Sequence, residues 1–124
     1  MKQIYSPDAP RAIGPYSQAI VVNGFVFCSG QVPLHPETGE MVGTTIQEQT
    51  EQSLKNLFAV LEAAGVGPDR VVKTTVLLSD MSNFADMNTV YERMFGDHKP
   101  ARAAFAVKTL PKNALVEIEA VAAL

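Results

Sequence analysis

The fold of this chain is decided by two stretches, Pro100-Ala101-Arg102-Ala103-Ala104-Phe105-Ala106-Val107 and Val116-Glu117-Ile118-Glu119. Both alternate with the two-residue period of a β-strand, so we predict a strand over each. The first strand begins with an arginine, and the second carries a carboxylate on every second residue. An arginine that binds an anion and a carboxylate that activates water are sufficient for a small hydrolytic site.

The alternation also divides each strand into two faces. Arg102, Ala104 and Ala106 share one face of the first strand, and only the opposite face, with Phe105 and Val107, is bulky and apolar. In the last strand Leu115, Glu117, Glu119 and Val121 alternate with Val116, Ile118, Ala120 and Ala122. We therefore expect the charged groups on a mixed face, beside small residues. The period alone leaves a second interpretation open, in which Glu117 and Glu119 are solvated groups on an open sheet face.

Turn and capping signals place the remaining elements. Asn23-Gly24 predicts a tight hairpin between strands 19–22 and 25–28, and Ser29-Gly30 is expected to end the second of them. Thr45 to Glu48 form a capping box that begins a helix of about five turns, which Gly65 ends. A strand is predicted over 71–78, with Val72, Val76 and Leu78 on its apolar face. A second helix follows, with an apolar stripe of Phe84, Met87, Tyr91, Met94 and Phe95 and with Asn88 at its border.

These elements predict an α+β fold in a single domain, residues 1–124, with both helices on one face of a sheet and the last two strands paired as a hairpin. The opposite face keeps Leu77, Leu115 and Val121, and in addition either Phe25 and Phe27 or Val26 and Cys28. That is too much apolar surface to leave in water. We expect a second copy of the chain to cover it.

Composition excludes several classes of protein. With 10 basic and 13 acidic residues the net charge is 10 − 13 = −3, and no cluster of Lys or Arg indicates nucleic-acid binding. A single cysteine, Cys28, excludes a disulfide framework and is expected to be a buried strand residue. His35 and His98 lie in separate loops that we expect to be exposed, which disfavours a catalytic triad or a zinc site. No apolar run approaches the roughly 20 residues of a membrane span, so we expect a cytoplasmic protein.

Two short motifs near the N-terminus are candidates for ligand contact. Gly14-Pro15-Tyr16 is a stiff turn that presents Tyr16 at the start of a strand, where its phenol can either hold a ligand or cap an edge of the core. Glycine at position 30 would let a ligand approach the backbone N–H groups, although glycines at strand ends are also common without a function.

The run from Pro100 to Ile118, P-A-R-A-A-F-A-V-K-T-L-P-K-N-A-L-V-E-I, resembles the signature of the Rid family, the reactive intermediate (enamine/imine) deaminases. Ile13 to Ala19 and Ser29 to Pro33 agree with it, so the resemblance covers almost the whole chain. It implies a chorismate-mutase-like α+β fold with the final strand inserted in the middle of the sheet. It also implies a homotrimer with the sheets inside and a pocket at each subunit interface.

The same resemblance implies a reaction and roles for individual residues. The reaction is hydrolysis of 2-imino acids such as 2-iminobutanoate and 2-iminopropanoate, formed from enamines released by pyridoxal-dependent dehydratases, to 2-oxo acids and ammonia, with no metal or cofactor. Arg102 would bind the substrate carboxylate and Glu117 would hold the attacking water. The pocket would be lined by Tyr16, Ser29, Gly30, Asn88 and Ala104. Ala104 stands where many members carry Cys or Ser, and it would contribute only its backbone N–H.

Two other functions remain open. One is a non-catalytic module that senses small carboxylates such as 2-oxo acids, because Arg102 is as useful for binding as for catalysis. The other is an interaction role, chaperone-like or ribonuclease-type. The acidic balance of the chain disfavours the ribonuclease.

Overall fold

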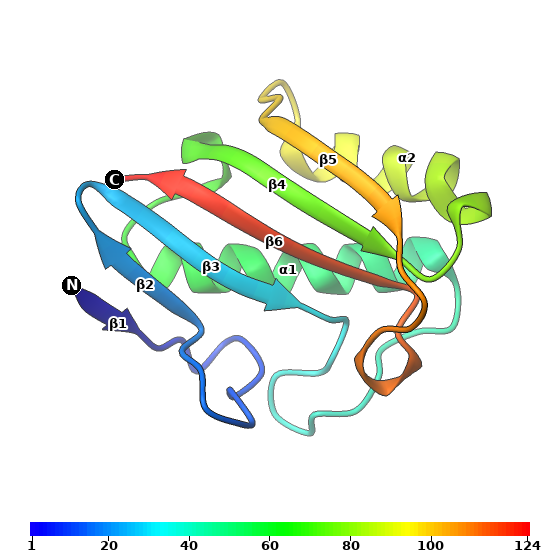
Figure 1. Cartoon of the computed structure of the whole chain (residues 1–124), viewed down its shortest axis with the longest axis horizontal. Helices are drawn as coiled ribbons and strands as arrows, with labels where there is room; N and C mark the ends of the chain where they lie inside the picture. Colours follow the sequence, from blue (N-terminus) through cyan, green and yellow to red (C-terminus); the bar gives the residue numbers. More distant parts are fainter.

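The computed structural model describes all residues from 1 to 124 and places two long helices on one face of a six-stranded sheet (Figure 1). The strands are β1 (Lys2–Ile4), β2 (Ala19–Val22), β3 (Phe25–Gln31), β4 (Val71–Leu78), β5 (Ala101–Ala106) and β6 (Val116–Ala123). The helices are α1 (Ile46–Ala63) and α2 (Phe84–Phe95), and short 3₁₀ turns cover Pro68–Arg70, Met81–Asn83 and Pro111–Asn113. The α+β prediction is confirmed, with the short edge strand β1 as an addition.

The strands lie in the order β1-β2-β3-β6-β4-β5. β6 is antiparallel to both β3 and β4, while β4 and β5 are parallel, as the crossover through α2 between them requires. The hairpin expected between the last two strands is therefore wrong, because β4 separates them. The physical reason is burial together with pairing: between β3 and β4, β6 hydrogen-bonds along both edges and buries its alternate residues, from Val116 to Ala122, beneath the helices.

Local signals begin and end the elements where the sequence predicted. Asn23 and Gly24 have φ values of 51° and 80°, as the tight turn between β2 and β3 requires. Thr45 Oγ1 accepts the Glu48 N–H at 3.1 Å, and the Glu48 carboxylate accepts the Thr45 N–H at 3.1 Å, which completes the capping box of α1. The hairpin and the first helix are thus confirmed.

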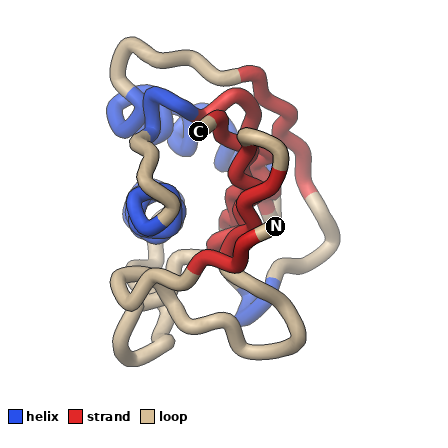
Figure 2. Tube along the Cα trace, turned by 90° about the vertical axis from the view of Figure 1, so that its left-hand side faces the viewer, coloured by secondary structure: helices blue, strands red, loops and turns tan.

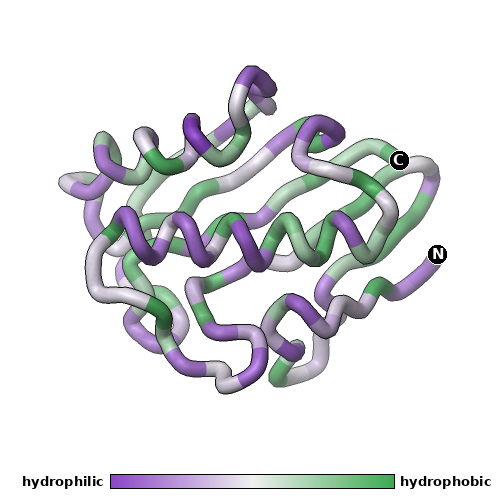
Figure 3. Tube along the Cα trace, turned by 180° about the vertical axis from the view of Figure 1, so that it is seen from behind, coloured by the Kyte–Doolittle hydropathy of each residue, from purple (hydrophilic) through white to green (hydrophobic).

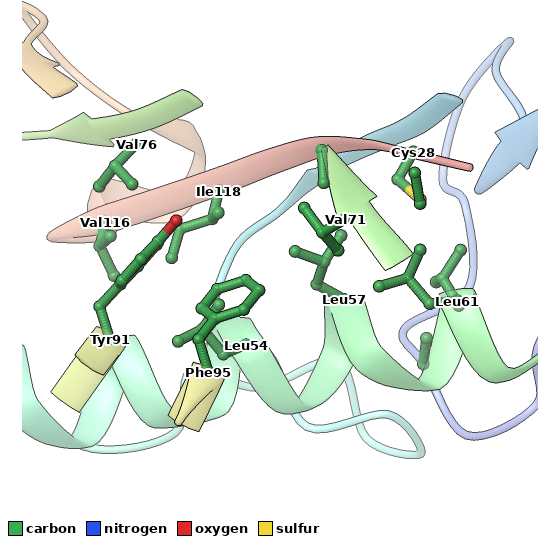
Figure 4. Close-up of a cluster of buried hydrophobic side chains, with 14 of the residues drawn as sticks. Cys28, Leu54, Leu57, Leu61, Val71, Val76, Tyr91, Phe95, Val116 and Ile118 are labelled. Atoms are coloured by element: carbon green, nitrogen blue, oxygen red, sulfur yellow. The ribbon is translucent and has the colours of Figure 1, made fainter. Parts of the chain in front are cut away.

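The core lies between the helices and the sheet, and Figures 2 and 4 show this layer from the side and in close-up. Its fully buried side chains are Val26, Leu54, Leu57, Val60, Leu61, Val76, Leu78, Met87, Val116, Ile118 and Ala122. Cys28 is buried among them, as predicted. In Figure 3, which views the molecule from the helix side, polar residues recur along the outer surface of α1.

Two expectations about strand faces and ends are wrong. A register irregularity between Val71 and Lys73 turns Val72 outward, so Val71 is buried in its place. Ser29-Gly30 does not end β3, which continues to Gln31 across a second irregularity between Cys28 and Gln31. Both bulges shift the alternation by a residue, which a simple two-residue period does not anticipate.

The sheet face away from the helices is apolar and uncovered in the single chain. Phe25, Phe27 and Phe105 are 42%, 47% and 48% exposed, and Leu77 and Val121 are half-buried beside them. Of the two pairs that the sequence left open, Phe25 and Phe27 are thus the ones on this face. The homotrimer that would cover it stays a prediction.

Polar residues of α1 hold the segment that follows β3. Ser53 Oγ donates to the Gln31 carbonyl at 2.6 Å, and Asn56 Nδ2 donates to the carbonyls of Val32 and Leu34 at 3.1 and 2.9 Å. Asn56 is fully buried, so water cannot replace these bonds. Its amide therefore fixes the chain where it leaves the sheet.

Replacing Asn56 by Ala should lower the free energy of unfolding by about 1 to 3 kcal/mol, because it leaves the buried Leu34 carbonyl without a donor, whereas the Val32 carbonyl keeps the Leu34 N–H. Urea unfolding at a fixed protein concentration measures this. Lys55→Ala, an exposed neighbour on the same helix, is the control and should change the free energy by no more than about 0.5 kcal/mol. Equal midpoints for the two variants would show that Asn56 does not anchor the segment.

Candidate functional site

The residues singled out in the sequence separate into two clusters in the chain. Arg102 and Asn88 lie together on the helix side of the sheet, whereas Tyr16, Gly30 and Glu117 line a cavity elsewhere. The expectation that the charged groups share one face is wrong. In the register of β4, Arg102 pairs with Thr74, which is buried beneath the helices, and Glu117 pairs with Leu77 on the opposite face.

The Arg102 cluster is built from the edge strand β5 and from α2. Arg102 Nη1 donates to Asn88 Oδ1 at 2.7 Å. The guanidinium carbon lies 4.9 Å from the centre of the Tyr91 ring and 5.5 Å from that of Phe84. The side chain is exposed and lines an open depression of about 420 Å³ together with His98. An arginine placed in this way can receive a small anion from solvent.

The Glu117 cluster lies where β3 ends and β6 begins. Its cavity, of about 270 Å³, is lined by residues of the N-terminal segment, of β3 and the segment after it, and of the loop before β6. Tyr16, Gly30 and Glu117 belong to it, as do the cations Arg11 and Lys112. Tyr16 is exposed at this cavity and does not cap the core.

Glycine at position 30 makes room for the Glu117 carboxylate. A Cβ added to Gly30 would lie 2.9 Å from Glu117 Cδ and still closer to its Oε1. Since the φ angle of Gly30 is not in the left-handed region, the requirement for glycine here is one of space. The close approach packs the carboxyl group against the backbone of β3.

The electrostatics of Glu117 suit a proton acceptor. Partial burial raises the pKa of its carboxyl above the ordinary value, and the like charge of Glu119 raises it further. A carboxylate with a raised pKa is a stronger base than a fully solvated one. It can take a proton from a bound water and return it later in a reaction.

Ser29 and Ala104 occupy less direct positions. Ser29 Oγ donates to the Ser17 carbonyl at 2.6 Å, and its N–H donates to the Gln18 carbonyl at 2.9 Å, so Ser29 ties the N-terminal segment to β3. It lies next to Gly30 but does not line the cavity. Ala104 is half-buried, two residues after Arg102, and packs against the core on the same side of the sheet as that arginine.

The histidines and the cysteine take no part in either cluster's proposed chemistry. His35 is exposed, as predicted, and its Nδ1 accepts the N–H of Glu37. The prediction that His98 is exposed is wrong: the loop before β5 folds back over the start of β4, where His98 Nε2 lies 2.6 Å from the Val71 carbonyl. Burial raises the pKa of the Cys28 thiol to about 12, so it is no nucleophile at neutral pH. No three His, Cys, Asp or Glu side chains come together in a way that could hold a metal ion.

Sequence reasoning missed Tyr91, Phe84, Arg11 and Lys112 as neighbours of the candidate site. Tyr91 and Phe84 were assigned to the apolar stripe of α2, although their spacing from Asn88 places all three on one side of the helix. Arg11 lies shortly before the Gly14-Pro15-Tyr16 turn. Lys112 carries a positive φ of 56°, which an isolated sequence does not reveal.

Comparison with known proteins gives concordant matches. Residues 6–124 match the protein family described as Endoribonuclease L-PSP. A RutC family protein of Pyrococcus horikoshii is 53% identical over 119 residues, which cover 96% of this chain and 94% of that protein. A mouse protein named 2-iminobutanoate/2-iminopropanoate deaminase is 49% identical, covering 98% and 90%. The crystal structure of TdcF from Escherichia coli with bound serine has a TM-score of 0.96 at 40% identity, covering 100% of this chain and 99% of that one.

No helix of this chain combines the length and apolarity that a membrane span needs.

Gly30→Ala should push the Glu117 carboxyl away from β3 towards solvent, because the added methyl group takes its place. The pKa of Glu117 should then fall towards its ordinary value, which a carboxyl NMR titration measures. Gly67→Ala is the matched control, since Gly67 also lacks a positive φ and its nearest neighbour is Asp69. An unchanged titration of Glu117 in Gly30→Ala would contradict the packing role of Gly30.

Glu119→Gln should also lower the pKa of Glu117, because it removes a like charge on the same strand face. The pKa of Glu117 is higher in the folded chain than its ordinary value of 4.5, so protonation of Glu117 stabilises the fold. This stabilisation is fully present below pH 4.5 and is lost as pH rises through the folded-state pKa. Stability in Glu119→Gln should therefore fall less between pH 4.5 and neutrality than in the unmodified chain. Parallel pH profiles for both proteins would rule out the coupling.

Proposed function

Because the chain belongs to the Rid family, which includes the L-PSP and RutC proteins, we propose that it hydrolyses 2-iminobutanoate, 2-iminopropanoate and related imino acids to 2-oxo acids and ammonia. The observation that carries this proposal is that one chain presents both an exposed Arg102 with free donors and a half-buried Glu117, packed on Gly30 at a cavity, whose pKa is raised. The reaction needs one group of each kind and no further side chain.

Arg102 and Glu117 lie on opposite faces of one sheet, so we propose that two copies of the chain complete each site. The uncovered apolar face around Phe27 and Phe105 supports this, since another copy would remove it from water. β5 is an edge strand, and its Arg102 side chain is exposed where a neighbouring copy could approach. A closed homotrimer satisfies both requirements with one repeated interface.

The substrate carboxylate would bind Arg102. Asn88 occupies Nη1, which leaves Nε and Nη2 without a partner in the chain, and these two donors can make parallel hydrogen bonds to a carboxylate. The serine bound to TdcF, which also carries a carboxylate, is consistent with a ligand of this size. Ala104 and Gly30 would add backbone donors near the imine.

Glu117 would act on water. The carboxylate takes a proton from a water molecule while the water oxygen bonds to the C=N carbon, and the C=N electron pair moves to nitrogen, which takes that proton from Glu117. The product of this step is a 2-amino-2-hydroxy acid, and Glu117 is again a carboxylate. A solvent proton then binds the amino group, and Glu117 takes the hydroxyl proton as the C–N bond breaks. Ammonia and the 2-oxo acid are released, and Glu117 returns its proton to solvent. The role of the protein is to position and to transfer protons, and both effects commonly contribute large rate factors.

A carboxylate-sensing module is the second candidate, because the Arg102 cluster could bind a small acid without any help from Glu117. Hydrolysis is favoured because Glu117 is packed against glycine at a cavity, where a sensor would have no need of a base. The family description names an endoribonuclease, but the net charge of −3 gives little support to RNA binding.

Arg102→Ala should lower kcat/KM for 2-iminobutanoate by about 100-fold or more, because it removes the bidentate carboxylate contact. Glu117→Gln should lower kcat by about 100-fold or more while changing KM little, since it removes only the proton acceptor. The imine is generated in place by a threonine dehydratase and trapped with semicarbazide, and the loss of trapped product measures turnover. Arg93→Ala, which removes the exposed arginine paired with Glu51, is the control and should behave like the unmodified protein.

Mixing the two inactive variants tests the shared site. In trimers reassembled from equal amounts of Arg102→Ala and Glu117→Gln chains, about one site in four would regain both native groups and should restore that share of the activity. Full activity in either single variant would overturn the deaminase. No recovery in verified mixed trimers would place both residues of a site in one chain.

A further inference from the structure

We propose that Tyr91, held in place by Thr74, is a positioning residue that fixes the guanidinium of Arg102 for a ligand carboxylate. The proposal rests on the proposed function only for its kinetic readout, because the positioning of Arg102 can be measured by ligand binding alone. Neither Tyr91 nor Thr74 was among the candidate site residues predicted from the sequence.

Arg102 needs external support to hold one geometry. It lies on the edge strand β5 with an exposed side chain, and no carboxylate of the chain lies within ion-pair distance of it. An arginine in that situation has many accessible rotamers, and ordering them on binding weakens affinity. A preorganised arginine avoids most of that loss.

One stripe of α2 provides the support. Phe84, Asn88 and Tyr91 are spaced four and three residues apart, so they lie on one side of the helix. Asn88 accepts one hydrogen bond from Nη1 at 2.7 Å, and the two rings lie within 5.5 Å of the guanidinium carbon. A cation over an aromatic ring within about 6 Å of its centre is attracted by the ring's electron-rich face. Tyr91, at 4.9 Å, is the closer of the two.

Thr74 fixes the ring of Tyr91. The two hydroxyl oxygens are 2.7 Å apart in a buried hydrogen bond, and Thr74 and Tyr91 are only 1% and 8% exposed. Thr74 is also the residue of β4 that pairs with Arg102. Figure 4 shows Tyr91 reaching from α2 towards the sheet, with its oxygen at the tip and Phe95 beside it. The ring is therefore held at its hydroxyl end by the strand next to Arg102 and along its side by Phe95, at 4.6 Å between centres.

The positive charge of Arg102 affects the pKa of the Tyr91 phenol. Burial raises the pKa of Tyr91, while the hydrogen bond with Thr74 and the positive charge of Arg102 oppose the rise. The side chain is thus a neutral phenol in the working range of pH, able to share its hydrogen with Thr74. With Nη1 bound to Asn88, the Nε and Nη2 donors of Arg102 are left for the ligand.

The first experiment measures two constants in Tyr91→Leu, the Kd for 2-oxobutanoate by calorimetry and KM for 2-iminobutanoate. Both constants should rise about tenfold, in line with the loss of a partly desolvated cation–π contact. Phe58→Leu is the matched control: it removes an aromatic ring that packs against the core from α1, and Phe58 has no ring contact with Tyr91 and none with the guanidinium. Its binding constants should change by less than about twofold, although it too loses core packing.

A second pair of variants keeps the proposal testable if Tyr91→Leu does not fold. Tyr91→Phe retains the ring and should restore most of the affinity, leaving a loss of about threefold from a less constrained ring. Thr74→Val should cost about threefold in the unmodified chain and nothing further in the Tyr91→Phe background, since its effect passes through the hydroxyl.

The outcomes separate this proposal from the deaminase. Affinity for 2-oxobutanoate that depends on Tyr91, in a protein that does not hydrolyse the imine, would support the positioning role and reject the deaminase. Equal binding constants in Tyr91→Leu and Phe58→Leu, in an active enzyme, would overturn the positioning role alone. A folded protein that binds no 2-oxobutanoate and hydrolyses no imine would overturn both.

Discussion

The structure depends on the insertion of β6 into the middle of the sheet. Its antiparallel hydrogen bonds to β3 on one side and to β4 on the other join the N-terminal strands to the pair β4 and β5. Its inner residues, Val116, Ile118, Ala120 and Ala122, are buried beneath the helices, so the last strand of the chain forms the floor of the core. The fold is completed only when the C-terminal segment has paired on both edges, which makes its contacts the most non-local of the molecule.

The same strand fixes the carboxylate on the opposite face. Because residues alternate, burying Val116 and Ile118 requires Glu117 between them to project away from the helices. The register of β5 and its contact with α2 turn Arg102 to the helix side. The two candidate site residues of one chain therefore face opposite sides of its sheet. The exposed phenylalanines lie on the same sheet face as Glu117, and covering them is a physical reason for a second copy to bind there. We propose that this copy brings its Arg102 to Glu117.

The sequence predicted the elements well wherever a short-range signal defines them. The Asn23-Gly24 turn, the Thr45 capping box and the apolar stripe of the second helix are set by local chemistry, and each is found where it was expected. The errors occur where one residue or one pairing shifts a pattern. A bulge in β4 turns Val72 outward, and β3 continues past Gly30 across another bulge. The loop before β5 folds back on β4, so His98 is half-buried. Arg102 and Glu117 were identified as candidates, but their opposite orientation was not.

By itself the sequence determined both helices, every strand except β1, the residues that carry charge, and the family that the pattern resembles, because these properties depend on neighbours within a few positions. Only the tertiary structure decided the strand order, the separation of Arg102 from Glu117, the close packing of Glu117 on Gly30, and the contacts of Tyr91 with Arg102 and Thr74. Each of these is a contact between residues far apart in the chain. Such contacts depend on how much apolar surface the whole sheet buries, and no local sequence pattern specifies that.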